Sequence, residues 1–153
     1  MCIRDRAGKL RQQDYHVWVV VGDGESQEGS VWEAAMSAAK WKLDNLTAIL
    51  DRNNLQNDWH VDELMPIEPV ADKWRAFGWH VVEIDGHDMD AIVPTLEDAR
   101  VRRGGPTLVL ARTIKGKGVS YMENVCEWHG KAPCQAEADQ ALDEIRRCSC
   151  EPS

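Results

Sequence analysis

Residues 16–29 read HVWVVVGDGESQEG, and this stretch decides the fold class. The run at 16–21 is short, apolar and rich in β-branched residues, which predicts a buried strand. Gly22-Asp23-Gly24 ends that strand, and a helical pattern begins at residue 30. In open parallel sheets, ligands bind where a strand ends and the next helix offers its free N–H groups. We therefore expect an α/β domain with a ligand site at this turn.

Three more apolar runs with strand character follow, and helical patterns lie between them. The strands are expected at 46–50, 79–84 and 107–111, and the helices at 30–41, 69–77 and 89–102. This alternation predicts right-handed βαβ crossovers and a mostly parallel sheet with helices on both faces. Residues 113–133 show no clear period and are expected to form a long loop, with a last helix at 135–147.

Length and composition limit the class of protein. A chain of 153 residues, 43% of them hydrophobic, suits one cored domain or a piece of one. The formal net charge of -8 argues against binding of nucleic acid, which needs clustered Lys and Arg. No run of eighteen apolar residues and no secretory signal is seen, so we expect no membrane partner and a cytoplasmic location. The odd number of cysteines, five, fits reduced thiols better than a disulfide framework.

The two ends of the chain fit neither a strand nor a helix period. We expect residues 1–13 and 148–153 to be non-native or disordered, as in a truncated reading frame. The partial domain is then expected at 14–147.

The turn after the first strand is acidic. Asp23, Glu25 and Glu28 would repel a bare phosphate, and a bound cation resolves that conflict. Mg²⁺ prefers oxygen ligands and is usually held by one or two side chains plus substrate phosphates. Asn53 follows the second strand, thirty positions after Asp23, so adjacent parallel strands could bring both tips together. The sequence predicts a magnesium site for a phosphate ligand here, although the spacing matches neither the dinucleotide fingerprint nor the P-loop.

Simpler interpretations exist for each of these features. Asp23 and Asn53 could belong to ordinary turns, and Glu28 could be a first-turn glutamate favoured by the helix dipole. His129 could be a surface residue of the loop, and Lys115 a solvated lysine. A zinc site is a further alternative, but its candidate ligands match no paired CxxC spacing. Those candidates are Cys126, His129, Cys134, Cys148 and Cys150.

The pairing of Gly22-Asp23-Gly24 with Asn53-Asn54 resembles the signature of thiamine-diphosphate enzymes. Further motifs are similar to the N-terminal section of transketolase, over roughly residues 14–147. They are QEG at 27–29, WEA at 32–34, DRNNLQ at 51–56, FGW at 77–79, DGHD at 85–88, KGKG at 115–118 and WHGKAP at 128–133. One departure is Asp58-Trp59, where the family more often has Asp-Gly, which puts the local turn in doubt.

The resemblance implies a thiamine-diphosphate-binding fold of the diphosphate-binding (PP) type with a bound Mg²⁺. Asp23, the Asn53 side chain and the Leu55 main-chain carbonyl would ligate the metal. Gly22 and Gly24 would lie at the cofactor's diphosphate, where the missing Cβ of Gly24 permits close approach.

Three more residues receive roles from the resemblance. Lys115 would add a positive charge near the phosphates. His129 would lie beside the diphosphate and the sugar substrate, where an imidazole can donate a hydrogen bond or move a proton. Glu28 would support the glutamate that a partner domain places at the cofactor's pyrimidine ring.

By the same resemblance, the activity is transfer of a two-carbon ketol unit from a ketose phosphate to an aldose phosphate, as in the pentose phosphate pathway. The partner would be a pyrimidine-binding C-terminal section or subunit, in a homodimer or heterotetramer, and the isolated chain is expected to be inactive. The alternatives are a deoxyxylulose-phosphate synthase, a 2-oxo acid dehydrogenase component, or a non-catalytic cofactor-binding module. The two enzymes are not expected to carry the WHGKAP motif at 128–133.

Overall fold

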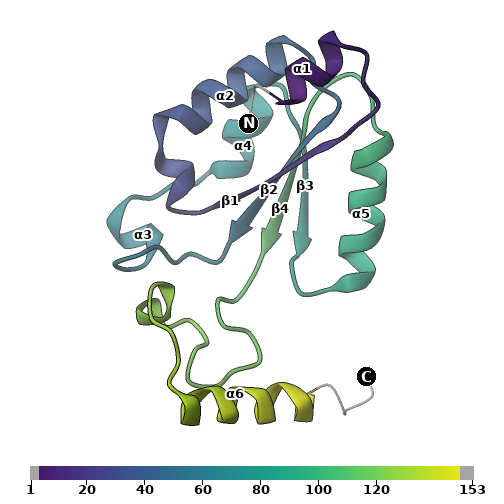
Figure 1. Ribbon diagram of the computed structural model, residues 1–153. Coiled ribbons are helices and arrows are strands. Elements are labelled where there is room, and N and C mark those ends of the chain that lie inside the picture. The colour runs from purple at the N-terminus through teal and green to yellow at the C-terminus, as the bar shows by residue number, and fades with distance from the viewer. Residues whose placement is uncertain (1–3, 149–153) are drawn as a thin grey trace.

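The computed structural model describes residues 4–148, and its centre is a four-stranded parallel sheet (Figure 1). The strands lie in the order β1-β2-β4-β3, and every neighbouring pair is parallel. Their bounds are β1 (Val17–Gly22), β2 (Leu46–Arg52), β3 (His80–Asp85) and β4 (Thr107–Arg112). The predicted α/β class with a parallel sheet is confirmed.

Helices cover both faces of this sheet. Figure 1 shows α2 (Gly29–Lys40) and α4 (Val70–Ala76) on one side and α5 (Met89–Val101) on the other. These helices and α6 (Gln135–Cys148) agree with the predicted ranges to within one residue at each end. Four short elements were not predicted from the sequence: α1 (Arg4–Leu10), η1 (Glu25–Gln27), α3 (Val61–Leu64) and η2 (Cys126–His129).

The main core lies between the sheet and the α2/α4 layer. Alternate residues of the two central strands point into it, as the two-residue period of a strand requires: Leu46, Ala48, Leu50, Leu108 and Leu110. Trp74 and Trp79 add the largest rings, with centroids 4.6 Å apart and an edge-to-face tilt. The core therefore fixes α2 against β1 and β2, which sets the geometry of the turn between β1 and α2.

The DGHD motif at 85–88 forms a turn and a helix cap. The backbone N–H of His87 donates to Asp85 at 2.8 Å, and the side chain of Asp88 accepts from the N–H of Asp90 at 2.9 Å. Asp88 is the N-cap of α5.

The structure places a helix within residues 1–13, for which non-native or disordered chain was expected. Residues 4–10 form α1, and the hydroxyl of Tyr15 donates to the carbonyl of Arg4 at 2.7 Å. Asn45 donates to the carbonyl of the buried Asp5 at 3.0 Å, so α1 is attached to the start of β2. Helix α1 is short and lacks an apolar period, which is why the sequence pattern missed it. Residues 1–3 and 149–153 lie outside the described residues.

Residues 113–134 and α6 lie beyond the carboxyl ends of the strands (Figure 1). Helix α6 packs on this loop, since Tyr121 donates to the carbonyl of Glu137 at 2.6 Å and the Ser120 hydroxyl to Glu144 at 2.9 Å. The predicted long loop is thus mostly turns, with η2 inside it. None of the helices within residues 4–148 has the length and apolar character needed to span a membrane.

Candidate active site

One cavity at the carboxyl ends of β1 and β2 gathers the residues that the sequence singled out. It has a volume of about 530 Å³. Its lining includes every predicted site residue: Gly22, Asp23, Gly24, Glu28, Asn53, Leu55, Lys115 and His129. These residues come from the end of β1 and the segment between β1 and α2, the segment after β2, the loop after β4, and η2. Proximity of the first two groups follows from the parallel pairing of β1 with β2, in which Gly22 faces Asp51.

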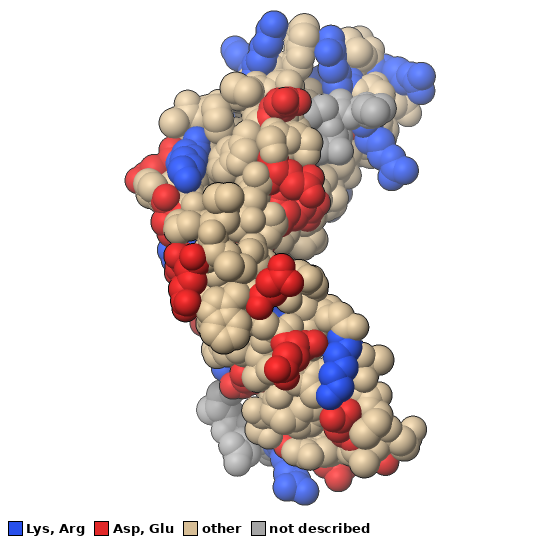
Figure 2. Space-filling model, turned by 90° about the vertical axis from the view of Figure 1, so that its left-hand side faces the viewer, with Lys and Arg blue, Asp and Glu red and all other residues tan. Residues whose placement is uncertain are grey.

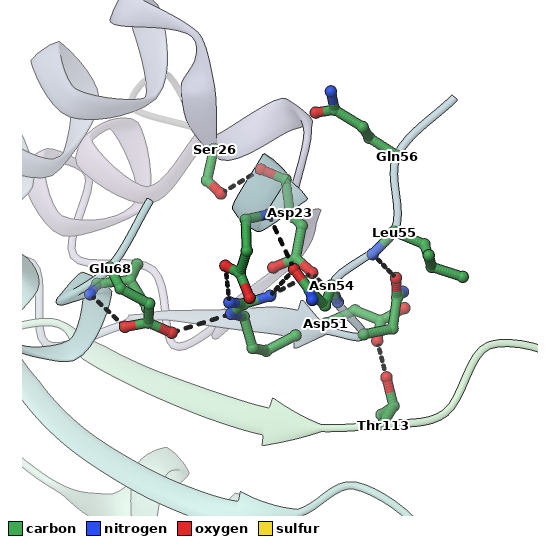
Figure 3. A network of polar contacts seen from close by, with 12 residues as sticks. Asp23, Ser26, Asp51, Asn54, Leu55, Gln56, Glu68 and Thr113 are labelled. Carbon is green, nitrogen blue, oxygen red and sulfur yellow. Dashed lines mark hydrogen bonds and ion pairs between the residues drawn. The ribbon is translucent and has the colours of Figure 1, made fainter. Parts of the chain in front are cut away.

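Asp23 is the most constrained of these side chains. It is 1% exposed, and its Oδ2 accepts from the backbone N–H of Asn54 and from the Arg52 guanidinium at 3.2 Å (Figure 3). Its Oδ1 is buried and has no hydrogen-bond partner. Burial raises the pKa of Asp23, and the nearby Arg52 charge opposes that shift. A buried carboxylate oxygen without a partner is costly, so Oδ1 is the place where a cation would be most stabilising.

The segment after β2 brings further oxygen atoms, from Asn53 and Leu55, to the same cavity. Oδ1 of Asn53 accepts from the N–H of Leu55 at 2.9 Å, which orients the amide and leaves a second lone pair on that oxygen. Asn54 has a φ of +63°, in the left-handed region that asparagine tolerates, and the chain turns there. Its carbonyl accepts from the N–H of Val61 at 2.9 Å, which closes the turn.

The donor set suits Mg²⁺ in its chemistry. One carboxylate, one amide oxygen and one main-chain carbonyl are hard oxygen ligands, and Mg²⁺ usually completes its shell with water and phosphate oxygens. Five carboxylates line the cavity, against Lys115 and His129: Asp23, Glu25, Glu28, Asp51 and Asp58. A diphosphate would be repelled there without a cation. In the described part of the chain, no group of three or more His, Cys, Asp or Glu is arranged to hold a metal. Two of the zinc candidates, Cys150 and the side chain of Cys148, lie outside the described residues.

The two glycines of the first turn differ in their surroundings. A Cβ on Gly22 would meet nothing within 4 Å, whereas a Cβ on Gly24 would lie 3.0 Å from Cβ of Gln56. The missing Cβ of Gly24 therefore makes room for Gln56. This is a second reason for glycine at this position, beside the close approach of a diphosphate that was expected from the sequence. Gln56 also accepts from Gln27 at 2.7 Å and so ties the two halves of the site together.

Lys115 and His129 contact each other across the loop. Nζ of Lys115 lies 3.3 Å from Nδ1 of His129. The indole N–H of Trp128 donates to the carbonyl of Tyr121 at 3.0 Å, which holds η2 against the preceding turn. The structure thus brings the KGKG and WHGKAP motifs together at the cavity.

Glu28 lines the cavity as the N-cap residue of α2. Its side chain makes no capping hydrogen bond to the helix and accepts from the Ser30 hydroxyl at 3.2 Å. The Glu28 carboxylate therefore does not cap the N-terminus of α2.

Several residues at this site received no site role from the sequence, although Glu25 was named there as part of the acidic turn. Glu25 accepts from the N–H of Gly22 at 3.3 Å, and Asp51 accepts from the hydroxyl of Thr113 (Figure 3). Asn57 and Asp58 complete the rim. All of these residues except Thr113 lie inside or beside the quoted motifs, so their position in the sequence could have indicated that they belong to the site. Arg52 also stands inside the DRNNLQ motif, but its burial could not be expected from the sequence, because arginine is seldom buried.

Comparison with known proteins agrees with this geometry. A family model described as "Transketolase, thiamine diphosphate binding domain" matches residues 5–146. The chain belongs to this family. It is therefore a thiamine-diphosphate-binding domain of the transketolase kind, as the sequence motifs indicated.

Two curated relatives and two solved structures define the similarity. The chain is 50% identical over 131 residues to SqwG, a subunit of the 6-deoxy-6-sulfo-D-fructose transketolase of a Clostridium species, covering 86% of this chain and 48% of that one. It is 43% identical over 139 residues to a subunit of the apulose-4-phosphate transketolase of Phocaeicola vulgatus, covering 91% and 50%. A transketolase structure from Campylobacter jejuni matches with a TM-score of 0.84 and 30% identity, covering 93% of this chain and 23% of that one. A Pichia stipitis transketolase in complex with sedoheptulose 7-phosphate matches with a TM-score of 0.79 and 28% identity, covering 86% and 19%.

The chain spans about half the length of these two curated relatives. The activity, substrates and partners of a whole protein are therefore matters for a proposal.

Proposed function

We propose that this chain is the diphosphate- and metal-binding half of a transketolase that moves a two-carbon ketol unit from a ketose phosphate to an aldose phosphate. The observation that carries the proposal is the single cavity lined by all eight predicted residues, among them Asp23 with its unpartnered Oδ1. When bound there, thiamine diphosphate supplies the nucleophilic carbon and the electron sink for ketol transfer.

The metal is Mg²⁺, held by Asp23, the side-chain oxygen of Asn53 and the carbonyl of Leu55. Asp23 contributes a full negative charge from a buried position, and the other two contribute neutral oxygens. The ion neutralises the acidic wall of the cavity so that a diphosphate can approach. Gly22 leaves open space beside the first turn, which suits that approach.

Lys115 and His129 serve the substrate side of the cavity. Both line it, and their contact places a cation and an imidazole next to each other. His129 donates to a phosphate or substrate oxygen or moves a proton during ketol transfer. Glu28 supports the glutamate of a pyrimidine-binding partner, because its carboxylate is free of the helix end.

The pyrimidine-binding half comes from another chain or section. The relatives from Phocaeicola, Clostridium and Actinobacillus are each named as one subunit of a transketolase, and this chain matches about half of each. The working enzyme is then a homodimer or a heterotetramer in the cytoplasm, acting in sugar-phosphate metabolism of the pentose phosphate type. The isolated chain would supply only one wall of the site. Precise orientation of the reactants can lower the reaction barrier by about 7–11 kcal/mol, and it needs both walls.

The test has a binding stage and a turnover stage. Calorimetric titration of the purified chain with MgCl₂, then with thiamine diphosphate, should show cofactor binding that requires the metal. Asp23→Asn should abolish this metal-dependent binding of the cofactor, since the neutral amide would hold the metal ion too weakly. Cofactor binding that is equally strong with EDTA would contradict the metal site.

Turnover is assayed with a ketose phosphate donor and an aldose phosphate acceptor. The chain alone should show none, and activity should appear only with a pyrimidine-binding transketolase subunit. In that complex, His129→Gln should lower turnover while cofactor binding is kept. Turnover by the isolated chain would overturn the assignment of a half-site, and unchanged turnover of His129→Gln would make that histidine a surface residue.

A further inference from the structure

Arg52, the last residue of β2, is a buried arginine that contacts three carboxylates. Its side chain is 6% exposed. The guanidinium nitrogens lie 3.2 Å from Oδ2 of Asp23, 3.0 Å from Oδ1 of Asp62 and 3.1 Å from Oε1 of Glu68. Figure 3 draws the contacts that join Glu68 on one side to Asp23 on the other. A planar guanidinium carries five donors in a fixed fork on three nitrogens, whereas an ammonium carries three donors on a single nitrogen.

The contacts of Arg52 leave the two oxygens of Asp23 in different states. Oδ2 accepts from Arg52 and from the backbone of Asn54, whereas Oδ1 is buried without a partner. A carboxylate held by two donors on one oxygen cannot rotate freely about its terminal bond. The orientation of Oδ1 in the wall of the cavity is therefore set by Arg52 and Asn54.

The same arginine attaches the segment after β2. It donates to Oδ1 of Asn54 at 3.2 Å, and that oxygen also accepts from the N–H of Asp62, the second residue of α3. Glu68, its third partner, accepts from the N–H of Val70 at 2.9 Å and so belongs to the start of α4. Arg52 thus joins β2, α3 and α4 through contacts that include Asn54, the residue between Asn53 and Leu55.

We propose that Arg52 is a positioning residue of the metal site: it holds Oδ2 of Asp23 so that Oδ1 alone faces the ion, and it fixes the segment that supplies Asn53 and Leu55. The inference rests on the proposed function, since it needs a divalent metal at Asp23. Arg52 does not touch the ion in this arrangement. It acts through Asp23 and Asn54, as hydrogen-bonding partners behind metal ligands do in other proteins.

Charge alone would give Arg52 the opposite effect. A positive guanidinium close to a cation site repels the ion, so its removal should tighten binding if charge were its main contribution. Removal should weaken binding if orientation of the ligands dominates. The two roles therefore differ in the sign of a measurable change.

Selectivity between metals separates positioning from simple support of the fold. Mg²⁺ demands near-octahedral geometry at short distances, whereas Ca²⁺ accepts longer and more varied contacts. A loosened ligand set should lose Mg²⁺ more than Ca²⁺. A chain that is merely less stable should lose both by the same factor.

The experiment is calorimetric titration of the full 153-residue chain with MgCl₂ and, separately, with CaCl₂. Arg52→Met should weaken Mg²⁺ binding by about tenfold or more, the usual effect of losing a partner behind a metal ligand, and Ca²⁺ binding by a smaller factor. Unchanged or tighter Mg²⁺ binding would overturn the proposal, and so would equal losses for the two ions. Failure of the unaltered chain to bind Mg²⁺ would instead remove the metal site of the proposed function, and this inference with it.

Two further variants keep the result interpretable. Arg52→Lys retains the positive charge but has its donors on a single nitrogen, so it cannot reproduce contacts that Arg52 makes from three nitrogens. It should show the same preference for losing Mg²⁺ even if Arg52→Met does not fold. Arg75→Met is the matched control, since Arg75 bridges Asp72 at 2.9 Å and Glu83 at 3.0 Å on the surface. Its Mg²⁺ affinity should equal that of the unaltered chain. If circular dichroism shows that neither Arg52 variant folds, Arg52 serves the fold as a whole and the positioning role is wrong.

Discussion

Nζ of Lys115 lies 3.3 Å from Nδ1 of His129, and both side chains line the cavity below the first turn. An ammonium group can only donate, so Nδ1 is the acceptor in this contact. In the neutral imidazole, the proton then resides on Nε2, which is left as the donor. The contact thus selects one of the two tautomers of His129.

This tautomer can be measured in the isolated chain. The ¹⁵N chemical shifts of His129, assigned with His129→Gln, should report a proton on Nε2. Lys115→Met removes the donor and should give a mixture of tautomers, whereas Lys117→Met should leave the shifts unchanged. A proton on Nδ1 in the unaltered chain would contradict the contact.

Two buried tryptophans should respond differently to the same change. The indole N–H of Trp79 donates to the carbonyl of Ala35 at 2.9 Å, whereas the buried indole nitrogen of Trp74 has no partner. Trp79→Phe loses a hydrogen bond, and Trp74→Phe removes an unsatisfied polar group. Because both lose similar volume, Trp79→Phe should cost more stability, by about 1 kcal/mol. Urea unfolding followed by tryptophan fluorescence measures the difference, and the reverse order would show that the packing term dominates.

Stability should decrease as the pH falls below 6.5, because of two histidines. Burial, with help from nearby arginines, lowers the pKa of His16 and of His80 below the ordinary 6.5. The folded chain then binds fewer protons than the unfolded chain in the window that starts at 6.5 and extends down to the folded pKa values. The neutral histidines contribute their full share to the free energy of unfolding above that window, and this share is lost as the pH falls through it. Urea midpoints at about pH 7.5 and about pH 5.5 test this, and the double variant His16→Gln/His80→Gln should show a smaller difference between the two.

The two glycines of the KGKG motif offer a matched pair. Gly116 and Gly118 have φ values of +74° and +88°, so alanine is strained at either position. A Cβ on Gly116 would also lie 2.6 Å from the carbonyl oxygen of Met122, whereas a Cβ on Gly118 would meet nothing within 4 Å. Gly118→Ala should cost about 1 kcal/mol from backbone strain alone.

Gly116→Ala should cost more than Gly118→Ala and should also move the neighbouring Lys115. If Gly116→Ala loses the single tautomer of His129 and Gly118→Ala keeps it, the turn at Gly116 positions Lys115 in the cavity. Equal stability losses in the two variants would show that the turn at Met122 adjusts without cost.

Much of the architecture was predictable from local patterns. Strands and helices were predicted to within a residue or two, because apolar period and turn residues carry that information. The missed elements are short: α3 has four residues, and α1 has seven with no apolar stripe. Their stability comes from tertiary contacts such as that of Tyr15 with Arg4, which no local pattern records.

Surface charge illustrates a second limit of the sequence. The net charge of -8 is a property of composition, but its distribution is not. Figure 2 shows acidic side chains spread along the middle of one face, with basic side chains gathered mainly at its upper end. This distribution of charge depends on which faces of the helices are exposed to solvent.

The sequence by itself determined the order of strands and helices, the turn at Gly22-Asp23-Gly24, and the set of oxygen-bearing residues that follow β1 and β2. Only the tertiary structure decided that β4 lies between β2 and β3, that Lys115 contacts His129, and that Arg52 is buried against Asp23. The physical reason is the range of the interactions. Backbone propensity and apolar period act over a few residues, whereas strand order, loop docking and the burial of a charge depend on packing between segments far apart in the chain.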